Sequence, residues 1–239
     1  MSEIARVCPY LHGQTGPARG EQHSLAGELY AHWQSSTPAA GVHYWRARSW
    51  GMLMWQPAYA SVLAVHCAHR ALDLQHFWQT ASAGVTQAWS LPADAVISEA
   101  GTPLITQAAQ SLLRYHQQHY QQLVQLSRYS AKQAACMSVD CVLSALLLAA
   151  RHCNWSADQL DEQTYLWLDA LQWQQHGKLM QVQLPSGACV PALNRQGCCQ
   201  HFRLPGAEAC STCPRWPMAT RLEKISFELE PTDDVLNTC

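Results

Sequence analysis

The sequence predicts an α+β protein that is mainly helical, with a few short antiparallel strands and a cysteine-rich clasp at its C-terminal end. Three observations predict this fold class. Apolar residues recur every three or four positions through most of residues 1–176, which is helical spacing. After residue 177 the apolar runs become short and are broken by glycine and proline, and four cysteines then fall within sixteen residues. We therefore expect a mainly helical, substrate-binding body over residues 1–176 and a clasp over residues 177–239.

Five stretches of the body carry the signals of α-helices. In chain order, the expected helices cover residues 24–33, 57–80, 105–129, 138–152 and 156–177. Ser24 and Ser156 can cap the first and the last helix, and Gln159 completes a capping-box pattern with Ser156. Pro57 suits the first turn of the second helix, because the N–H that proline lacks would be unpaired there. The helix from Ser138 is mostly apolar, so we expect it to be deeply buried.

The remaining elements are short. Residues 1–20 contain several glycines and prolines and predict an irregular lead-in, and residues 35–41 predict a loop. The expected strands cover residues 84–89, 96–99, 178–184, 188–193 and 225–230. The first two should form a hairpin or a pair of short strands, and the turn at residues 185–187 predicts a hairpin for the next two. Alternating apolar residues predict the last strand.

The composition argues against three classes of protein: nucleic-acid-binding, transmembrane and disulfide-rich secreted proteins. The chain has 239 residues and a net charge of −2, and charged residues make up 13% of it, about half the usual share. The net charge argues against a nucleic-acid partner. No apolar run is long enough to span a bilayer, so we expect no transmembrane segment. The first residues lack the pattern of a secretory signal, so we expect the eleven cysteines to lie in a reducing compartment rather than in a disulfide scaffold.

The strongest functional signal is a cluster of four cysteines in the clasp. Cys198 and Cys199 are adjacent, and ten residues later Cys210 and Cys213 form a C-x-x-C motif. Four thiolates suit either zinc or an iron–sulfur cluster. Structural zinc sites usually separate paired cysteines by two to four residues, whereas the wider core of a two-iron cluster accommodates an adjacent pair more easily. The spacing therefore favours a [2Fe–2S] cluster, with a Zn(Cys)4 site, or disulfides and chance, as the alternatives.

This pattern, C-C-x10-C-x2-C near the C-terminal end, resembles the FhuF-type ferric-siderophore reductases. The match to this family is close over roughly the last forty residues. Over the preceding two hundred residues it is weaker, although the sequence is compatible with the family. It implies a cytoplasmic [2Fe–2S] protein that passes one electron to siderophore-bound Fe(III), so that iron leaves as Fe(II). The cluster ligands would be Cys198, Cys199, Cys210 and Cys213. Whether the siderophore is a hydroxamate or a catecholate, and whether the protein also touches the inner membrane, stays open.

Residues 45–50 place two arginines between two tryptophans and are our first choice for contact with the substrate. Arginine pairs with oxyanions and stacks on flat groups, and tryptophan supplies apolar walls. The expected substrate-binding residues are Arg46, Arg48, Trp50, Trp55, Gln56 and Tyr59. The alternative is ordinary packing with a surface ion pair. Because one-electron transfer requires proximity, we expect these residues beside the cluster. Substitution of Arg128 or Arg151 should have little effect on binding if those two residues are only structural or exposed.

The expected helix over residues 57–80 carries a polar stripe of His66, His69, Asp73 and His76, at spacings of three, four and three. Such a stripe can bind a metal or line a substrate cleft, although a solvated polar face is the favoured interpretation. If the stripe faces the cleft, His66 or His69 could supply a proton to the leaving ligand.

The chain contains no dinucleotide-binding or P-loop motif, so we expect electrons to come from an external ferredoxin-like or flavodoxin-like protein. Two other classes compete with the reductase interpretation. One is a non-catalytic interaction protein with a structural Zn(Cys)4 site. The other is a simple electron carrier, which is disfavoured because about 190 residues precede the cysteine motif.

Overall fold

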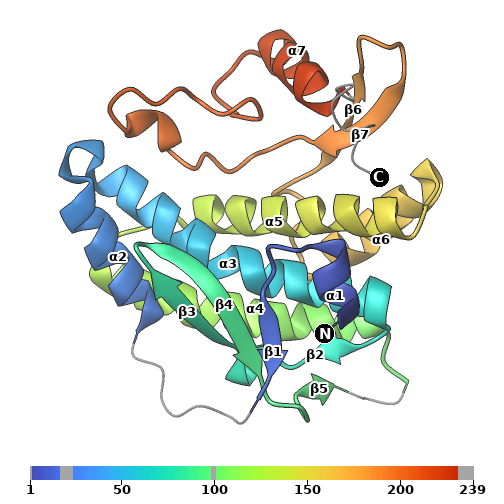
Figure 1. Cartoon of the computed structure of the whole chain (residues 1–239), viewed down its shortest axis with the longest axis horizontal. Helices are drawn as coiled ribbons and strands as arrows, with labels where there is room; N and C mark the ends of the chain where they lie inside the picture. Colours follow the sequence, from blue (N-terminus) through green and yellow to red (C-terminus); the bar gives the residue numbers. More distant parts are fainter. Residues whose placement is uncertain (1, 17–23, 98–100, 231–239) are drawn as a thin grey trace.

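Figure 1 shows the computed structural model of the chain, which describes residues 2–16, 24–97 and 101–230. Within these ranges the α-helices are α1 (Ser2–Val7), α2 (Leu25–Ser36), α3 (Gly41–Ala68), α4 (Leu104–Leu126), α5 (Ala131–His152), α6 (Ala157–Ala170) and α7 (Met218–Leu229). The strands are β1 (Gly13–Thr15), β2 (Ala71–Leu72), β3 (Trp78–Ser82), β4 (Val85–Leu91), β5 (Val96–Ile97), β6 (Leu179–Gln183) and β7 (Cys189–Leu193). The expected fold class, a mainly helical α+β protein, is confirmed. Parts of three expectations, residues 17–20, residues 98–99 and residues 231–239, lie outside the described residues.

The core of the body is built around α3 and α5, which pack against each other. In Figure 1, α5 runs through the middle of the molecule, with α3 and α4 on one side and the β6–β7 hairpin and α7 on the other. The indole Nε1 of Trp50, in α3, donates a hydrogen bond of 2.9 Å to the carbonyl oxygen of Ala134 in α5. The helix α5 is long and apolar enough to cross a membrane by length and composition alone, but most of it is buried within the described structure, as is usual for a core helix.

The longest helix, α3, differs from the sequence expectation at both ends. It begins at Gly41 instead of Pro57, so Pro57 lies in its interior, and it ends at Ala68 instead of Thr80. An internal proline costs a helix about 3 kcal/mol, yet α3 continues through the buried Pro57, because the apolar residues on both sides of it, such as Met54 and Ala58, are packed in the core. His69 ends the helix in the left-handed conformation, with φ of 52°.

Several shorter elements also differ from expectation. The lead-in contains α1 and β1, and β1 pairs with β4 in parallel, so the strands are not all antiparallel. The strands β4 and β5 do not form a hairpin together, because β4 pairs with β3 and β1 while β5 pairs with β2. Residues 225–230 were expected to be a strand, but residues 225–229 belong to α7. Six residues cannot distinguish alternation from helical spacing, and the buried or half-buried Arg221, Ile225 and Leu229 are four apart.

Other predictions are confirmed. Ser24 caps α2, and Ser156 forms a capping box with Gln159 at the start of α6. The hairpin of β6 and β7 is present, with Leu179 paired to Leu193. The helix α5 begins seven residues before Ser138, at a cap formed by Ser130. The boundary expected at residue 176 stays a prediction.

Candidate functional site

The cysteine loop (residues 194–217) joins β7 to α7 and is fastened to one face of α5. Gln133, Met137 and Asp140 form this face, because residues four and three apart lie above one another on a helix. Gly197 presses against it so closely that an added Cβ would lie 2.8 Å from both the backbone nitrogen and the Cα of Met137. The side-chain amide of Gln133 donates a hydrogen bond of 2.7 Å to the carbonyl oxygen of Cys198. The position of the cysteine pair is thus set by α5.

Asp140 is the central polar contact of this attachment. Its two carboxylate oxygens accept hydrogen bonds from the backbone N–H groups of Gln196 (3.1 Å) and Gly197 (2.8 Å). The guanidinium of Arg195 lies 3.6 Å from the same carboxylate. Burial raises the pKa of Asp140 to about 6, although Arg195 and the two N–H groups act to lower it. A second buried cation, Arg221 in α7, donates to the carbonyl oxygen of Arg195 (3.2 Å) and to Asn194.

The surroundings of the four motif cysteines shift their pKa values in different directions. The Cys210 thiol lowers the pKa of Cys199 to about 5, and its interaction with Cys199, together with burial, raises the pKa of Cys210. Burial raises the pKa of Cys198. Cys198 and Cys213 are 9% and 2% exposed, whereas Cys199 and Cys210 are half-buried. The two halves of the motif therefore lie in one loop, with one cysteine of each half buried.

Backbone and side-chain donors surround these sulfurs. The backbone N–H of Gln200 acts to lower the pKa of Cys198, and that of His201 acts to lower the pKa of Cys199. The hydroxyl of Thr212 lies 3.9 Å from the sulfur of Cys210. Donors of this kind stabilise thiolates, which are the form that binds metal.

The donor set fits a two-iron cluster. A [2Fe–2S] cluster takes four protein thiolates, and the loop offers four cysteines with hydrogen-bond donors beside them. Four thiolates also suit a tetrahedral zinc ion, so the donor set is shared by the two cofactors. Within residues 2–16, 24–97 and 101–230, no three His, Cys, Asp or Glu side chains lie close enough together to hold a metal ion.

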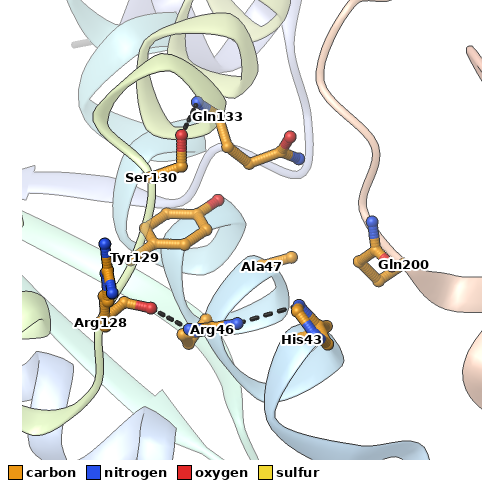
Figure 2. Close-up of a pocket in the computed structure, with 8 residues that line it drawn as sticks. All are labelled: His43, Arg46, Ala47, Arg128, Tyr129, Ser130, Gln133 and Gln200. Atoms are coloured by element: carbon orange, nitrogen blue, oxygen red, sulfur yellow. Dashed lines mark hydrogen bonds between the residues drawn. The ribbon is translucent and has the colours of Figure 1, made fainter.

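A polar cavity of about 580 Å³ lies between the body and the cysteine loop (Figure 2). Its lining residues are His43, Arg46, Ala47, Arg128, Tyr129, Ser130, Gln133 and Gln200. In Figure 2, Gln200 lies on the wall opposite the other seven residues. Gln200 directly follows the cysteine pair, and Gln133 is hydrogen-bonded to Cys198, so two lining residues belong to or contact the cluster-binding loop. Among the described residues that line this cavity there is no Asp or Glu.

Arg46 is held in a fixed position at the edge of the cavity. Its guanidinium donates to the carbonyl oxygens of Val42 (3.2 Å) and Arg128, and it lies 2.9 Å from the Nδ1 of His43. Partial desolvation and the positive charges of Arg46 and Arg203 lower the pKa of His43. The cavity therefore presents positive charge and neutral hydrogen-bonding groups.

The other residues expected to bind substrate lie elsewhere. Arg48 stacks its guanidinium on the ring of Trp33, at 5.3 Å. Trp50 and Gln56 are fully buried in the core, where Gln56 accepts a hydrogen bond of 2.9 Å from Gln79. Neither side chain reaches an open surface in the described structure, because both lie on the faces of α3 that pack against other elements.

Trp55 and Tyr59 line a second cavity, of about 460 Å³. Its lining residues are Cys8, Tyr10, Trp55, Tyr59, Asp140, Cys141, Ser144, Leu148, Leu193 and Arg195. The two cavities lie on either side of the attachment of the cysteine loop to α5, the first near Gln133 and the second near Asp140. The expected substrate residues are thus divided between two cavities and the core.

The polar stripe expected on one long helix does not exist, because α3 ends at Ala68. His66 is packed between α3 and α6 and accepts a hydrogen bond of 2.9 Å from the Nε1 of Trp167. Burial lowers the pKa of His66 to about 4, so its imidazole is neutral near pH 7. His69 is the C-cap of α3, and Asp73 caps the short 3-10 helix at Leu74–His76. Within the described chain, neither His66 nor His69 lines either of the two cavities.

Sequence reasoning missed His43, Arg128, Gln133, Asp140 and Gln200. Arg128 was expected to have little effect on binding, but it lines the first cavity. The position of Gln200 could have predicted its role, since it directly follows the two adjacent motif cysteines. Asp140 could also have been selected from the sequence, because it is an acidic residue in a mostly apolar helix. No local pattern connects His43 with Arg128, because they meet only in the tertiary structure.

Comparison with protein families identifies the cysteine loop. Residues 195–215 match the family described as the FhuF 2Fe-2S C-terminal domain, and Cys198, Cys199, Cys210 and Cys213 fit its cysteine motif. The match confirms the resemblance inferred from the spacing of the cysteines and replaces the zinc alternative with an iron–sulfur cofactor. The chain therefore carries an FhuF-type 2Fe-2S C-terminal domain and is an iron–sulfur protein whose cofactor is a [2Fe–2S] cluster.

Proposed function

We propose that this protein is a ferric-siderophore reductase, in which the siderophore-bound Fe(III) takes up one electron and is released as Fe(II). Cys198, Cys199, Cys210 and Cys213 would hold the [2Fe–2S] cluster, which would supply that single electron and be re-reduced by an external donor. The observation that carries the proposal is the first cavity, whose wall includes Gln200 and Gln133 and therefore adjoins the cluster ligands. A substrate in this cavity would lie next to Cys198 and Cys199.

The cavity has the properties that a ferric siderophore requires. Its volume of about 580 Å³ is within the range of small-molecule sites, roughly 300–1,000 Å³. Arg46 is already fixed by its neighbours, so little side-chain entropy is lost when it pairs with an oxygen-rich ligand. Arg128 is exposed and can reach the same ligand. Guanidinium groups and side-chain amides suit the oxygen donors that surround iron in hydroxamates and catecholates.

One electron is sufficient to release the iron. Hard oxygen donors hold Fe(III) much more tightly than Fe(II), so reduction weakens the complex without breaking a covalent bond of the siderophore. The residues of the chain then have three tasks: Arg46 and Arg128 bind the complex, Gln133 and Asp140 hold the cysteine loop against the cavity, and Gln200 forms the shared wall.

The proposal also includes an external electron donor and a cytoplasmic location. The chain carries no nucleotide-binding motif, so we assign the supply of electrons to a separate ferredoxin-like or flavodoxin-like protein. We place the reaction in the cytoplasm, where reduced electron-donor proteins are available, with docking at the inner membrane as an additional step.

The test compares the two cavities. Arg46→Ala and Arg128→Ala should each weaken the binding of ferric siderophores about ten- to hundred-fold, the cost of a lost charge-assisted contact, while the visible spectrum of the cluster stays unchanged. Gln200→Asn shortens a lining side chain without straining the left-handed backbone at this position, and it should weaken binding less. Arg151→Ala removes an exposed arginine elsewhere and serves as the control.

Titrations with hydroxamate and catecholate complexes, followed by single-turnover reduction, provide the measurement. If the Arg46 and Arg128 variants bind and reduce like the parent protein while Trp55→Ala and Tyr59→Phe fail, then the substrate occupies the second cavity. If none of these variants has an effect and no ferric siderophore binds, the reductase proposal is wrong.

A further inference from the structure

Positive charge gathers in the cysteine loop, although the chain as a whole is slightly acidic. The full sequence has 15 basic and 17 acidic residues, which gives a net charge of −2. Residues 194–217 contain three arginines and one glutamate, so the loop carries +2 with its cysteines neutral, and the rest of the chain carries −4. The segment with the cysteine motif is therefore also the segment that attracts anionic partners.

Two of these arginines lie at the surface, over the same aromatic ring. The guanidinium carbon of Arg215 lies 4.1 Å from the centre of the Phe202 ring, and that of Arg203 lies 5.7 Å from it. The Nε of Arg203 also donates a hydrogen bond of 2.9 Å to the side-chain oxygen of Gln200. Both arginines are exposed. Because stacking holds them in place, they lose less side-chain entropy when they contact a partner.

A third cation, Lys224 of α7, extends this surface. Its ammonium nitrogen lies 5.2 Å from the centre of the Trp216 ring. The indole Nε1 of Trp216 donates a hydrogen bond of 3.1 Å to the carbonyl oxygen of Cys210, and Phe202 lies three residues after Cys199. The surface thus adjoins both halves of the cysteine motif. We call it the cationic face, and it consists of Phe202, Arg203, Arg215, Trp216 and Lys224.

The charges of the cationic face are not neutralised by the residues that the structure describes. The two ion pairs that these residues form lie within α1 and between Arg195 and Asp140. The single acidic residue of the loop, Glu208, is exposed and takes part in neither of them. The carboxylate of Glu228 in α7 accepts a hydrogen bond of 2.6 Å from the Ser211 hydroxyl. The cations of the face are therefore available to the carboxylates of another molecule.

An acidic redox protein is the partner that this surface fits. Four thiolates make the cluster site negative, and a reduced cofactor is negative as well, so the two repel each other unless cations lie between them. The cationic face supplies such cations around half-buried rings, and aromatic residues and arginine are enriched in protein interfaces. An anionic membrane would instead favour protruding aromatic side chains, whereas Phe202 and Trp216 are half-buried.

We propose that the cationic face docks a small acidic electron-carrier protein, which passes one electron to the cluster. The cofactor of the carrier is oxidised by one electron and the cluster is reduced by one, with no bond formed or broken. The docking surface deepens the function proposed above, on which it rests, because a reductase without a nucleotide-binding motif needs an external donor. Arg203 borders the first cavity through its hydrogen bond to Gln200, so Arg215 and Lys224 give the sharper test.

The experiment is calorimetric titration of the cluster-loaded protein with an acidic [2Fe–2S] ferredoxin and with an acidic flavodoxin at low ionic strength. Arg215→Gln and Lys224→Gln should each weaken binding about two- to five-fold, and Arg215→Glu combined with Lys224→Glu should weaken it roughly ten-fold or more. Added salt should weaken binding by the parent protein more than binding by this double variant. Arg151→Gln removes an exposed arginine of α5 and should change nothing. The visible spectrum shows that each variant still carries its cluster.

Three outcomes would overturn the docking surface. They are parent-like binding of both carriers by the double variant, binding of neither carrier by the parent protein, and binding of vesicles that contain phosphatidylglycerol in place of the carriers. Titration with ferric siderophores tests the reductase function separately. Failure of that titration, with a carrier still bound through Arg215 and Lys224, contradicts the reductase function and leaves the docking surface standing.

Discussion

The body and the clasp are stabilised in different ways. The body has a continuous apolar core in which large side chains such as Trp50, Trp167 and Leu63 are completely buried. The separate apolar cluster of the clasp consists of only four buried residues in its described part, Val182, Leu184, Ala192 and Ile225. The clasp therefore buries little apolar surface of its own. It is held instead by hydrogen bonds to α5 and by the cysteines that bind its cofactor.

Two parts of one chain can thus be stabilised by different interactions, apolar burial in the body and cofactor binding with polar contacts in the clasp. Burial of apolar surface stabilises a large unit, whereas a segment of about sixty residues rarely buries enough to remain ordered without a metal or another staple. The clasp can therefore respond to the state of its cofactor while the body stays folded.

Removal of the cluster should give the largest effect. Chelation of iron from the reduced protein should lower the hydrogen-exchange protection of the cysteine loop and α7 by about 100-fold or more, because metal-binding free energy contributes directly to the folding of such segments. The amides of α3 and α5 should keep their protection. Equal loss of protection in both regions would show that the body and the clasp are one cooperative unit.

Gly197→Ala should detach the clasp without touching a ligand. The new Cβ would collide with the backbone of Met137, which cannot move without distorting α5, and overpacking of this kind costs about 1–3 kcal/mol. Gly51→Ala is the matched control, because its Cβ would meet the Cε of the same methionine at an ordinary 3.5 Å and alanine favours the helix. Chemical unfolding should show a less stable Gly197→Ala protein and an equal or more stable Gly51→Ala protein.

Asp140 should make the attachment of the clasp depend on pH. Its pKa is raised to about 6, above the ordinary 3.8, so the folded state binds this proton more tightly than the unfolded state does. The free energy of unfolding should therefore fall as the pH rises from about 4 to about 6, by about 2–3 kcal/mol from this group, and then stay constant.

The Asp140→Asn variant should lose this slope while keeping the shape of the side chain. Its amide nitrogen would face one of the two N–H donors, so we also expect faster exchange in the cysteine loop above pH 6. The measurement is the free energy of unfolding of both proteins between pH 4 and pH 8. An unchanged slope in the variant would assign the pH dependence to another group.

Much of the site was predictable because its signals are local. The spacing of the four cysteines identifies the cofactor whatever the rest of the chain does, since the ligands and their turns are close in sequence. The capping box at Ser156 and the hairpin turn at residues 185–187 are predictable for the same reason. The length of α3 was not predictable, because the signal of Pro57 is local whereas the burial that overrides it involves residues from several other helices.

The sequence by itself thus determined the fold class, the cofactor and the four cysteines that fit its motif, all of which depend on short-range spacing and composition. The tertiary structure alone decided which residues lie beside the cysteine loop. Arg46 and Gln200 are 154 positions apart, and they line one cavity only because α5 holds the cysteine loop beside the start of α3. Contacts between distant segments depend on how complete elements pack, and that information is spread over the whole core rather than written in any one motif.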